Sequence, residues 1–211
     1  KIGIGDSVKV EAGVEGHEPE EGSLRIRYPS GRRQKVRMER GGGDNRYVAT
    51  LENVQESFTF QVVVNDGRSR RESVRALPRP SVVELVGKQN YPAYMKLPPS
   101  THRPGEFLLY PSSELSLKIT ANQPLKRGTV RLLGVGEKNA VEAIVDRQDP
   151  RVLHAVVEVE AGLNGFTVEL LDAEEMASRD ATVYRVDVLS DEPPKVRIVK
   201  PSRQRELVTA R

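Results

Sequence analysis

The sequence predicts an all-β protein made of two tandem antiparallel β-sandwich domains that are joined by a short Pro-rich linker. Three observations predict this fold class. Short stretches of alternating apolar and polar residues recur along the 211 residues, with turn-forming residues between them. No stretch has the 3.6-residue periodicity of a packed helix. One set of strand patterns also returns later in the chain in the same order, which is typical of stacked modules.

The first predicted domain covers residues 1–80. Its apolar side chains alternate with polar ones, as in half-buried strands, over residues 8–12, 24–28, 36–38, 47–51 and 58–64. Turn signals separate these runs, and they include the glycines at 41–43 and the sequence Asn65-Asp66-Gly67. A last apolar pair at residues 74 and 76 leads into the prolines of the linker.

The second predicted domain covers residues 81–193, and its residues 81–113 form an N-terminal extension. Four blocks repeat the first domain at a nearly constant separation: residues 116–121 match 7–12, residues 128–132 match 22–26, Ala155 matches Ala49, and residues 166–167 match 58–59. Residues 172–179 have a helical composition, but their length suits a turn between strands. Residues 194–211 resemble residues 80–85 at their start, so we expect a further module or a tail there.

Composition excludes several classes of function. Acidic and basic residues nearly cancel at a net charge of +3, which argues against a nucleic-acid-binding tail. Aromatic residues make up 5% without any Trp, so stacking platforms for bases are not expected. The absence of Cys excludes disulfides, thiolate metal sites and thiol nucleophiles. No apolar run reaches the length of a membrane helix, and the lack of an initiating Met leads us to expect a piece of a longer protein.

The most distinctive charge feature is a predicted hairpin over residues 23–38, which contains six basic residues and no acidic one. We interpret this hairpin as a candidate interaction surface for an anionic polymer, a lipid headgroup surface or an acidic partner. The alternative is a solvated sheet face that charge protects from edge pairing, screened by Glu18, Glu20 and Glu21. The six residues are Arg25, Arg27, Arg32, Arg33, Lys35 and Arg37.

Proline-rich segments predict stiff joints between modules. Residues 77–80 and 191–194 are short and proline-rich, so adjacent domains would form a rod that bends little. Tyr91 and Tyr94 stand in an extended segment that we expect to pack against the neighbouring module. The alternative is an aromatic strip for carbohydrate, shared with Phe107 and Tyr110. The candidate inter-domain junction therefore consists of Pro78, Pro80, Tyr91, Pro92 and Tyr94.

Catalytic and metal-binding patterns are sparse. The histidines His17, His102 and His154 have no neighbouring carboxylate or nucleophile at a useful spacing. The glycines at 41–43 are not followed by the Lys-Ser or Lys-Thr of a phosphate-binding loop. Acidic residues at the turns 44–45, 172–175 and 191–192 are too few for a predicted calcium site. We therefore expect no catalytic residues, no cofactor and no metal.

The segment Tyr91-Pro92-Ala93-Tyr94, with Leu97-Pro98 and residues 112–125, resembles the extracytoplasmic part of large bacterial membrane-anchored proteins that are catalogued as a domain of unknown function. The resemblance implies tandem immunoglobulin- or fibronectin-like modules in the bacterial cell envelope, and it supplies no catalytic residues. It leads us to expect a non-enzymatic scaffold or spacer that contacts a protein partner or neighbouring domains of its own chain. The alternative is a ligand-binding module for cell-wall polysaccharide or an anionic polymer. Neither nucleic acid nor a membrane segment within these residues is expected.

Overall fold

The computed structural model describes residues 1–15, 21–42, 45–136 and 139–189. Within these ranges the chain is all-β, with nineteen strands, one 3₁₀ turn η1 (Ala93–Met95) and no α-helix. This confirms the all-β class predicted from the alternating pattern. The sequence predicts no helix at residues 172–179, and the structure confirms this: Asp172 ends strand β17, and the residues that follow form a turn with one isolated bridge between Leu171 and Ala177.

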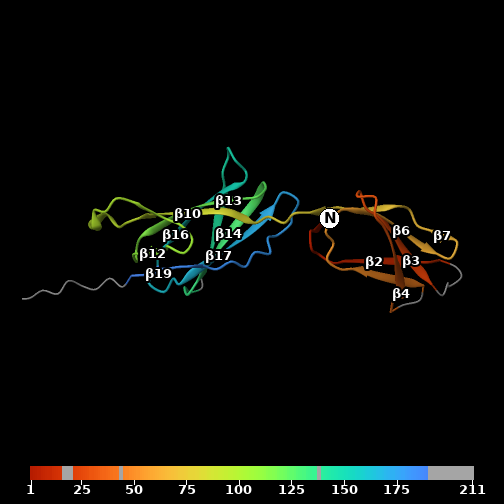
Figure 1. The fold of residues 1–211 in the computed structure, drawn as a ribbon. Coiled ribbons are helices and arrows are strands. Elements are labelled where there is room, and N and C mark those ends of the chain that lie inside the picture. The colour runs from red at the N-terminus through yellow and green to blue at the C-terminus, as the bar shows by residue number, and fades with distance from the viewer. Residues whose placement is uncertain (16–20, 43–44, 137–138, 190–211) are drawn as a thin grey trace, which may run out of the picture.

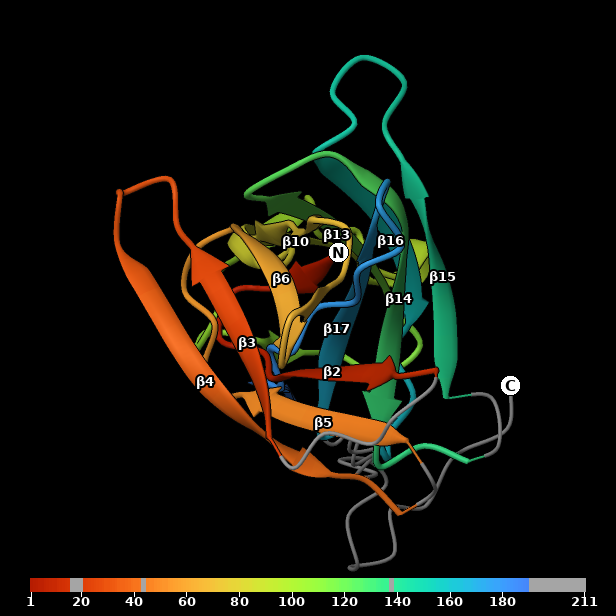
Figure 2. The same ribbon diagram turned by 90° about the vertical axis from the view of Figure 1, so that its right-hand side faces the viewer.

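The first nine strands form one group, which we call the first lobe. They are β1 (Ile2–Gly3), β2 (Val8–Gly13), β3 (Gly22–Arg27), β4 (Arg33–Arg40), β5 (Arg46–Leu51), β6 (Phe58–Val64), β7 (Gly67–Arg68), β8 (Glu72–Val74) and β9 (Ala76–Leu77). The main sheet has the order β2-β5-β4-β3-β6-β7, and β8 also pairs with β6. Figure 2 shows that these strands curl around a common centre. The short strands β1 and β9 pair in parallel, so the start of the chain lies beside the end of the lobe.

The remaining strands form the second lobe. They are β10 (Val82–Asn90), β11 (Ser100–His102), β12 (Leu108–Leu109), β13 (Glu114–Ala121), β14 (Leu125–Leu133), β15 (Ala140–Val145), β16 (Val152–Glu158), β17 (Gly165–Asp172), β18 (Tyr184–Arg185) and β19 (Asp187–Val188). Eight of them follow the order β11-β10-β13-β16-β15-β14-β17-β18, and β12 pairs in parallel with β19. Figure 1 shows the two lobes arranged along one axis, with the chain passing between them from β9 to β10.

The sequence repeat has a counterpart in strand pairing. In the first lobe β2 pairs with β5, β5 with β4, β4 with β3, and β3 with β6. In the second lobe β13 pairs with β16, β16 with β15, β15 with β14, and β14 with β17, all antiparallel as in the first lobe. The matched blocks therefore occupy equivalent strands. The additional strand β10 pairs with β13 and continues the second sheet outward to β11.

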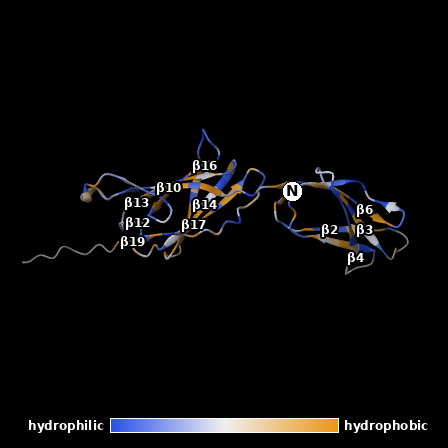
Figure 3. Cartoon of the chain, in the orientation of Figure 1, coloured by the Kyte–Doolittle hydropathy of each residue, from blue (hydrophilic) through white to orange (hydrophobic). Residues whose placement is uncertain are grey.

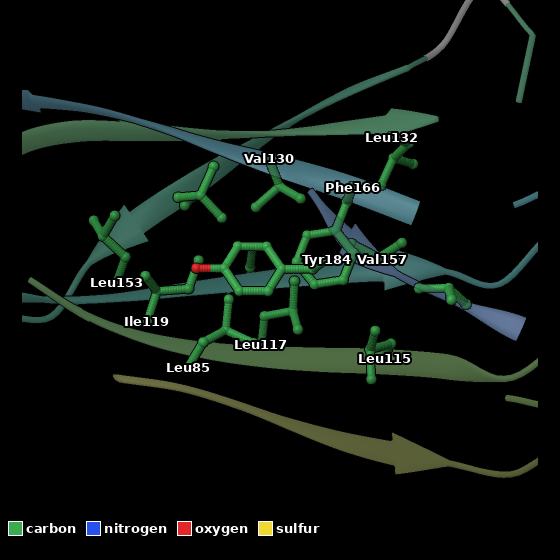
Figure 4. Close-up of a cluster of buried hydrophobic side chains, with 14 of the residues drawn as sticks. Leu85, Leu115, Leu117, Ile119, Val130, Leu132, Leu153, Val157, Phe166 and Tyr184 are labelled. Carbon is green, nitrogen blue, oxygen red and sulfur yellow. The ribbon is translucent and has the colours of Figure 1, made fainter. Parts of the chain in front are cut away.

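Each lobe has its own hydrophobic core. In the first lobe the buried side chains come from β2 to β6, with Leu24 and Ile26 of β3 almost fully inaccessible. In the second lobe Phe166 stacks on Tyr184 with ring centroids 5.2 Å apart, and Leu117, Ile119 and other apolar side chains surround the pair (Figure 4). Figure 3 shows apolar segments along the strands and polar segments at the exposed hairpin ends. Complete burial of a Leu or Ile side chain contributes about 1.5–3 kcal/mol, so these alternating positions are the main stabilising contacts.

Strand β10 is longer than its apolar pattern predicts. The sequence indicates a strand over residues 82–86 and then an extended segment, whereas the strand runs on to Asn90. The pattern breaks off at Gly87, where a Cβ would lie 2.6 Å from a ring carbon of Phe107. Gln89 is buried and donates to the Ser113 hydroxyl over 2.7 Å, so a polar residue occupies a core position. Because a hydrogen-bonded polar residue is buried here in place of an apolar one, the apolar pattern of the sequence does not reveal the second half of the strand.

Candidate functional site

The hairpin of β3 and β4 separates its apolar and basic side chains onto opposite faces. Leu24 and Ile26 of β3 and Met38 of β4 point into the first core, and Val36 packs against it. Their neighbours along the strands point outward because successive side chains alternate between the two faces of a sheet. We call these outward side chains the basic face, and all of them are exposed: Arg25, Arg27, Arg33, Lys35 and Arg37.

Strand register places the basic residues directly opposite one another. Arg25 faces Lys35, Arg27 faces Arg33, and Arg37 faces Ser23. On the other side of β3, strand β6 contributes neutral residues, with Gln61 beside Arg25 and Thr59 beside Arg27. Like charges in directly opposed positions destabilise a sheet. The face therefore concentrates positive charge at some cost in stability.

Most of this charge has no counter-ion among the described residues. Arg37 Nη2 lies 2.9 Å from a carboxylate oxygen of Glu21, and both side chains are largely exposed. Within the described ranges, Arg25 and Lys35 have no carboxylate within ion-pair distance. The predicted screening residues Glu18 and Glu20 lie outside the described residues. A groove of about 440 Å³ runs over this part of the face, lined by Glu21, Gly22, Ser23, Arg25, Lys35, Arg37, Val63 and Asn65.

Arg32 belongs to a different surface from the other five basic residues. Its guanidinium carbon lies 3.9 Å from the centroid of the Tyr28 ring, and Nη2 lies 3.3 Å from a carboxylate oxygen of Glu56. These contacts border a second groove, of about 620 Å³, between the β3–β4 turn and residues 50–56. The strand pattern could not reveal this difference, because Arg32 lies in the turn where alternation no longer decides the direction of a side chain.

Charged groups meet where the two lobes adjoin. Arg79, between Pro78 and Pro80, donates from Nη2 to the Asp6 carboxylate over 2.6 Å and from Nη1 to the carbonyl of Ala177 over 2.7 Å. Arg179 also reaches Asp6, with 2.8 Å between Nη1 and Oδ1. We call Asp6, Arg79 and Arg179, with the Ala177 carbonyl, the junction cluster. It ties the N-terminal part of the first lobe to the turn after β17.

The junction cluster perturbs the ionisation of Asp6. Hydrogen bonding from Arg79 holds the pKa of the Asp6 carboxyl below its ordinary value, with help from the backbone N–H of Gly3 and against the effect of burial. The Asp6 side chain is only 12% exposed and that of Arg79 is 22% exposed. Gly3 allows Arg79 to approach, because a Cβ at that position would lie 2.9 Å from Cγ of Arg79.

The linker is also held from the second lobe. Asn122 donates to the Arg79 carbonyl over 3.0 Å, and its side-chain oxygen accepts from the Ser81 N–H over 3.0 Å. The Asn122 N–H in turn donates to the Ser81 carbonyl over 3.1 Å. Pro80 between them is buried, while Pro78 is exposed. The backbone on both sides of Pro80 is therefore fixed to the loop that follows β13.

The tyrosine segment does not lie beside this linker. Tyr91 and Pro92 follow the end of β10 and Tyr94 lies in η1, whereas Pro80 precedes the start of β10. Nine strand residues separate the two ends, a length of about 30 Å. The Tyr91 hydroxyl bonds to Ser100 over 2.8 Å, and its ring meets that of Tyr110 at 5.6 Å. The structure thus does not bring Tyr91, Pro92 and Tyr94 to the junction with the first lobe.

The expected aromatic strip is also not displayed as a continuous surface. Phe107 is buried in the second core, where its ring lies edge-on to Phe166 at 5.5 Å. Tyr94 is 69% exposed, but Tyr91 and Tyr110 are partly buried against each other. The rings of Phe107, Tyr91 and Tyr110 therefore mainly contact other side chains of this protein and are not arranged as a surface for a carbohydrate.

A hydrogen-bonded network around His102 was not predicted. His102 Nε2 lies 2.7 Å from the Ser100 hydroxyl, and Nδ1 lies 3.0 Å from the Glu106 carbonyl, so Nδ1 carries the proton that is donated to it. The residues join strand β11 to the turn before β12. A Ser two positions before a His in a strand is the only sequence signal for this contact. His154 instead lies 3.3 Å from Asp146, and His17 is outside the described residues.

The turn acids serve as acceptors for local N–H groups. Asp172 Oδ1 accepts from the N–H groups of Glu174 and Met176, and Oδ2 accepts from Gln123. These bonds shape the turn after β17 that supplies Ala177 and Arg179. Among the described residues, no group of three or more His, Cys, Asp or Glu is placed to hold a metal ion. Asp44, Asp191 and Glu192 lie outside those residues.

Comparisons with known proteins add little. No family model matches the chain, and no curated protein matches it. Among solved structures, the chain is similar to a chimeric titin Z1Z2 functionalized with a KLER exogenous peptide from decorin, at 10% identity and a TM-score of 0.30, over 90% of this chain and 93% of that one. In the described part of the chain, no helix has the length and apolar character needed to cross a membrane.

Proposed function

We propose that this chain is a non-enzymatic spacer: two tandem antiparallel β-sandwich modules of immunoglobulin or fibronectin type that hold neighbouring parts of a longer protein at a fixed distance and angle. The two separate cores and the repeated strand pairing support the division into modules. The proposed boundary lies between residues 80 and 81, in the segment between β9 and β10, and residues 81–113 extend the second module through β10, β11 and β12.

The observation that carries this proposal is the junction cluster. A flexible linker between independent modules needs no contacts with them, whereas Arg79 bonds to both lobes. Asn122 fixes the backbone beside it, and the flanking prolines restrict the remaining dihedral angles. A joint held in this way resists bending, which is the property that a spacer requires.

The cellular setting that we propose is extracytoplasmic, in the periplasm or envelope of a bacterium and within a membrane-anchored parent protein. The sequence resemblance around Tyr91-Pro92-Ala93-Tyr94 supports this setting. Protein partners or neighbouring domains of the parent chain would then contact the exposed strands. Protease accessibility of the parent protein in intact and permeabilised cells tests the location, and digestion only after cytoplasmic lysis would contradict it.

Small-angle scattering tests the spacer function directly. The wild-type chain should give one narrow set of elongated shapes, because the junction cluster holds the lobes in line (Figure 1). Arg79→Ala should broaden this set and lower the mean radius of gyration. The matched control is Arg75→Ala, which removes an exposed Arg that has no side-chain partner among the described residues. An equally broad ensemble in the wild-type chain would contradict the proposal.

A further inference from the structure

The strongest unexplained feature of the first lobe is the basic face on β3 and β4. We propose that this face binds a linear polymer of small polyol units joined by phosphodiesters, such as a poly(glycerol phosphate) chain that runs along the strands. This binding function goes beyond the spacer role and does not depend on it, because no residue of the junction cluster takes part.

Charge is the first argument for a polyanion. Arg25 lies directly opposite Lys35, and Arg27 lies directly opposite Arg33. In each pair, a neutral or acidic residue in place of one cation would stabilise the sheet. A solvated face needs charge for solubility, but it does not need like charges in register. A bound polyanion would neutralise both pairs at once. Such a polymer could lie in the groove beside Arg25, Lys35 and Arg37, which is lined mainly by polar residues.

The kind of cation is the second argument. Four of the five basic residues are Arg, whose planar guanidinium binds the two free oxygens of a phosphodiester in a bidentate manner. A face that served only solubility could equally be built from Lys, which is a less specific point charge. The composition of the basic face therefore favours recognition of an oxyanion.

Spacing along the strands is the third argument. Successive cation pairs on β3 and β4 are two residues apart, which corresponds to about 6.8 Å along an antiparallel strand. A three-carbon polyol phosphodiester has as many backbone bonds in one repeat as two residues of an extended peptide. Each phosphate of such a chain can therefore meet one pair of cations without strain.

Two other polyanions fit the face less well. Single-stranded nucleic acid has a similar phosphate repeat, but its binding sites use aromatic rings for base stacking. Among the described residues, the aromatic side chains of the neighbouring strand β6, Phe58 and Phe60, belong to the core side of the sheet. An extended acidic peptide presents its carboxylates alternately on two sides, so half of its charge would face away. A backbone phosphate avoids both mismatches.

The test measures the affinity of the full chain for a fluorescent oligomer of glycerol phosphate, by anisotropy at several salt concentrations. The triple variant Arg25→Gln, Arg27→Gln, Lys35→Gln should bind about tenfold or more weakly near 50 mM salt, and the slope of log K against log salt should fall by about 2 if three contacts are lost. The matched control, Arg103→Gln, Arg147→Gln, Arg185→Gln, makes the same change in net charge in the second lobe and should bind like the wild type. These three control residues are exposed, with no ion pair among the described residues.

Several outcomes would overturn this proposal. Equal loss in the two triple variants would show that only net charge matters. Equal or tighter binding of a single-stranded DNA oligomer with the same number of phosphates would replace the polyol phosphate by nucleic acid, and preference for polyglutamate would replace it by an acidic peptide. Circular dichroism checks that both variants are folded. The scattering profile should be unchanged in both, so failure of binding and failure of the spacer function are distinguishable.

Discussion

Lys35 shows how the opposed charges of the basic face affect stability. Its cross-strand partner is Arg25. Lys35→Glu replaces a repulsive pair by an attractive one, so we expect the free energy of unfolding to rise by about 0.2–1 kcal/mol. Urea unfolding followed by circular dichroism measures this change. The same substitution should weaken binding of the glycerol phosphate oligomer, which would separate stability from function at one position.

A matched control for Lys35 exists in the second lobe. Lys88 is an exposed strand residue whose cross-strand neighbours are Ser116 and Thr101, both neutral. Lys88→Glu should therefore change the free energy of unfolding by no more than about 0.5 kcal/mol. Destabilisation by Lys35→Glu, or equal stabilisation by both substitutions, would contradict the assignment of repulsion to the Arg25–Lys35 pair.

Asp6 links the stability of the chain to pH. Its pKa is lowered in the folded state, chiefly by hydrogen bonding from Arg79. Stabilisation by a carboxylate with a lowered pKa is present above its unfolded pKa, near 4, and is lost as the pH falls through the folded value. Asp6→Asn should thus lower the free energy of unfolding by about 1–2 kcal/mol at pH 7.

Stability measured at low pH provides the control for the Asp6→Asn prediction. As the pH falls below about 4, the wild-type carboxyl becomes protonated, so the difference between wild type and Asp6→Asn should shrink. Denaturant unfolding at pH 7 and at pH 3 measures this difference. A difference that stays constant between the two pH values would show that the Asn side chain disturbs packing and that the ion pair is not responsible.

At the scale of a single element, β10 combines close packing with a polar core position. Gly87 faces the ring of Phe107 and the side chain of Leu115, so Gly87→Ala would force atoms to within 2.6 and 3.0 Å of its Cβ. Overpacking of this kind costs about 1–3 kcal/mol. We expect a corresponding drop in the free energy of unfolding, measured by urea titration. Gly13→Ala is the control, because a Cβ at that end of β2 meets nothing within 4 Å; equal losses would contradict this packing argument.

Most strands could be predicted because alternation is a local signal. Strand β6 coincides with the run of apolar positions from Phe58 to Val64, and the basic hairpin follows from the same periodicity in β3 and β4. The two-residue strands β1 and β9 could not be found, because so short a pair has no period and its partners are far apart in sequence. The hairpin sequence predicts one surface for all six basic residues, but Arg32 lies apart from the basic face because alternation does not extend into a turn.

On the scale of the whole molecule, the contacts between the lobes were beyond the reach of sequence patterns. Asp6, Arg79 and Arg179 are scattered along the chain, and an ion pair between distant residues leaves no local signature. The prolines point to residues 77–80, and the Pro-bounded extended segment that follows assigns Tyr91 and Tyr94 to the same joint. The length of β10 carries them to its other end.

The two arginines of the junction cluster should differ in their effect on the shape of the molecule. Arg79 lies in the linker, its side chain is 22% exposed and it donates hydrogen bonds to both lobes, whereas the side chain of Arg179 is 66% exposed and, among the described residues, forms an ion pair with Asp6 alone. An exposed ion pair contributes about 0–1 kcal/mol, so loss of Arg179 should alter the joint little. Loss of Arg79 also frees the Ala177 carbonyl and removes the hydrogen bonds by which the linker contacts both lobes.

Distances between spin labels can show which of Arg79 and Arg179 contributes more to holding the two lobes in a fixed arrangement. The chain has no native Cys, so labels can be placed at Thr50→Cys in β5 and Val156→Cys in β16, both exposed. Arg79→Ala should broaden the distance distribution between the labels, while Arg179→Ala should leave it close to that of the wild type. Broadening by Arg179→Ala alone would place the joint at the turn after β17. In that case the prolines would serve only to extend the linker, and its angle would be set by that turn.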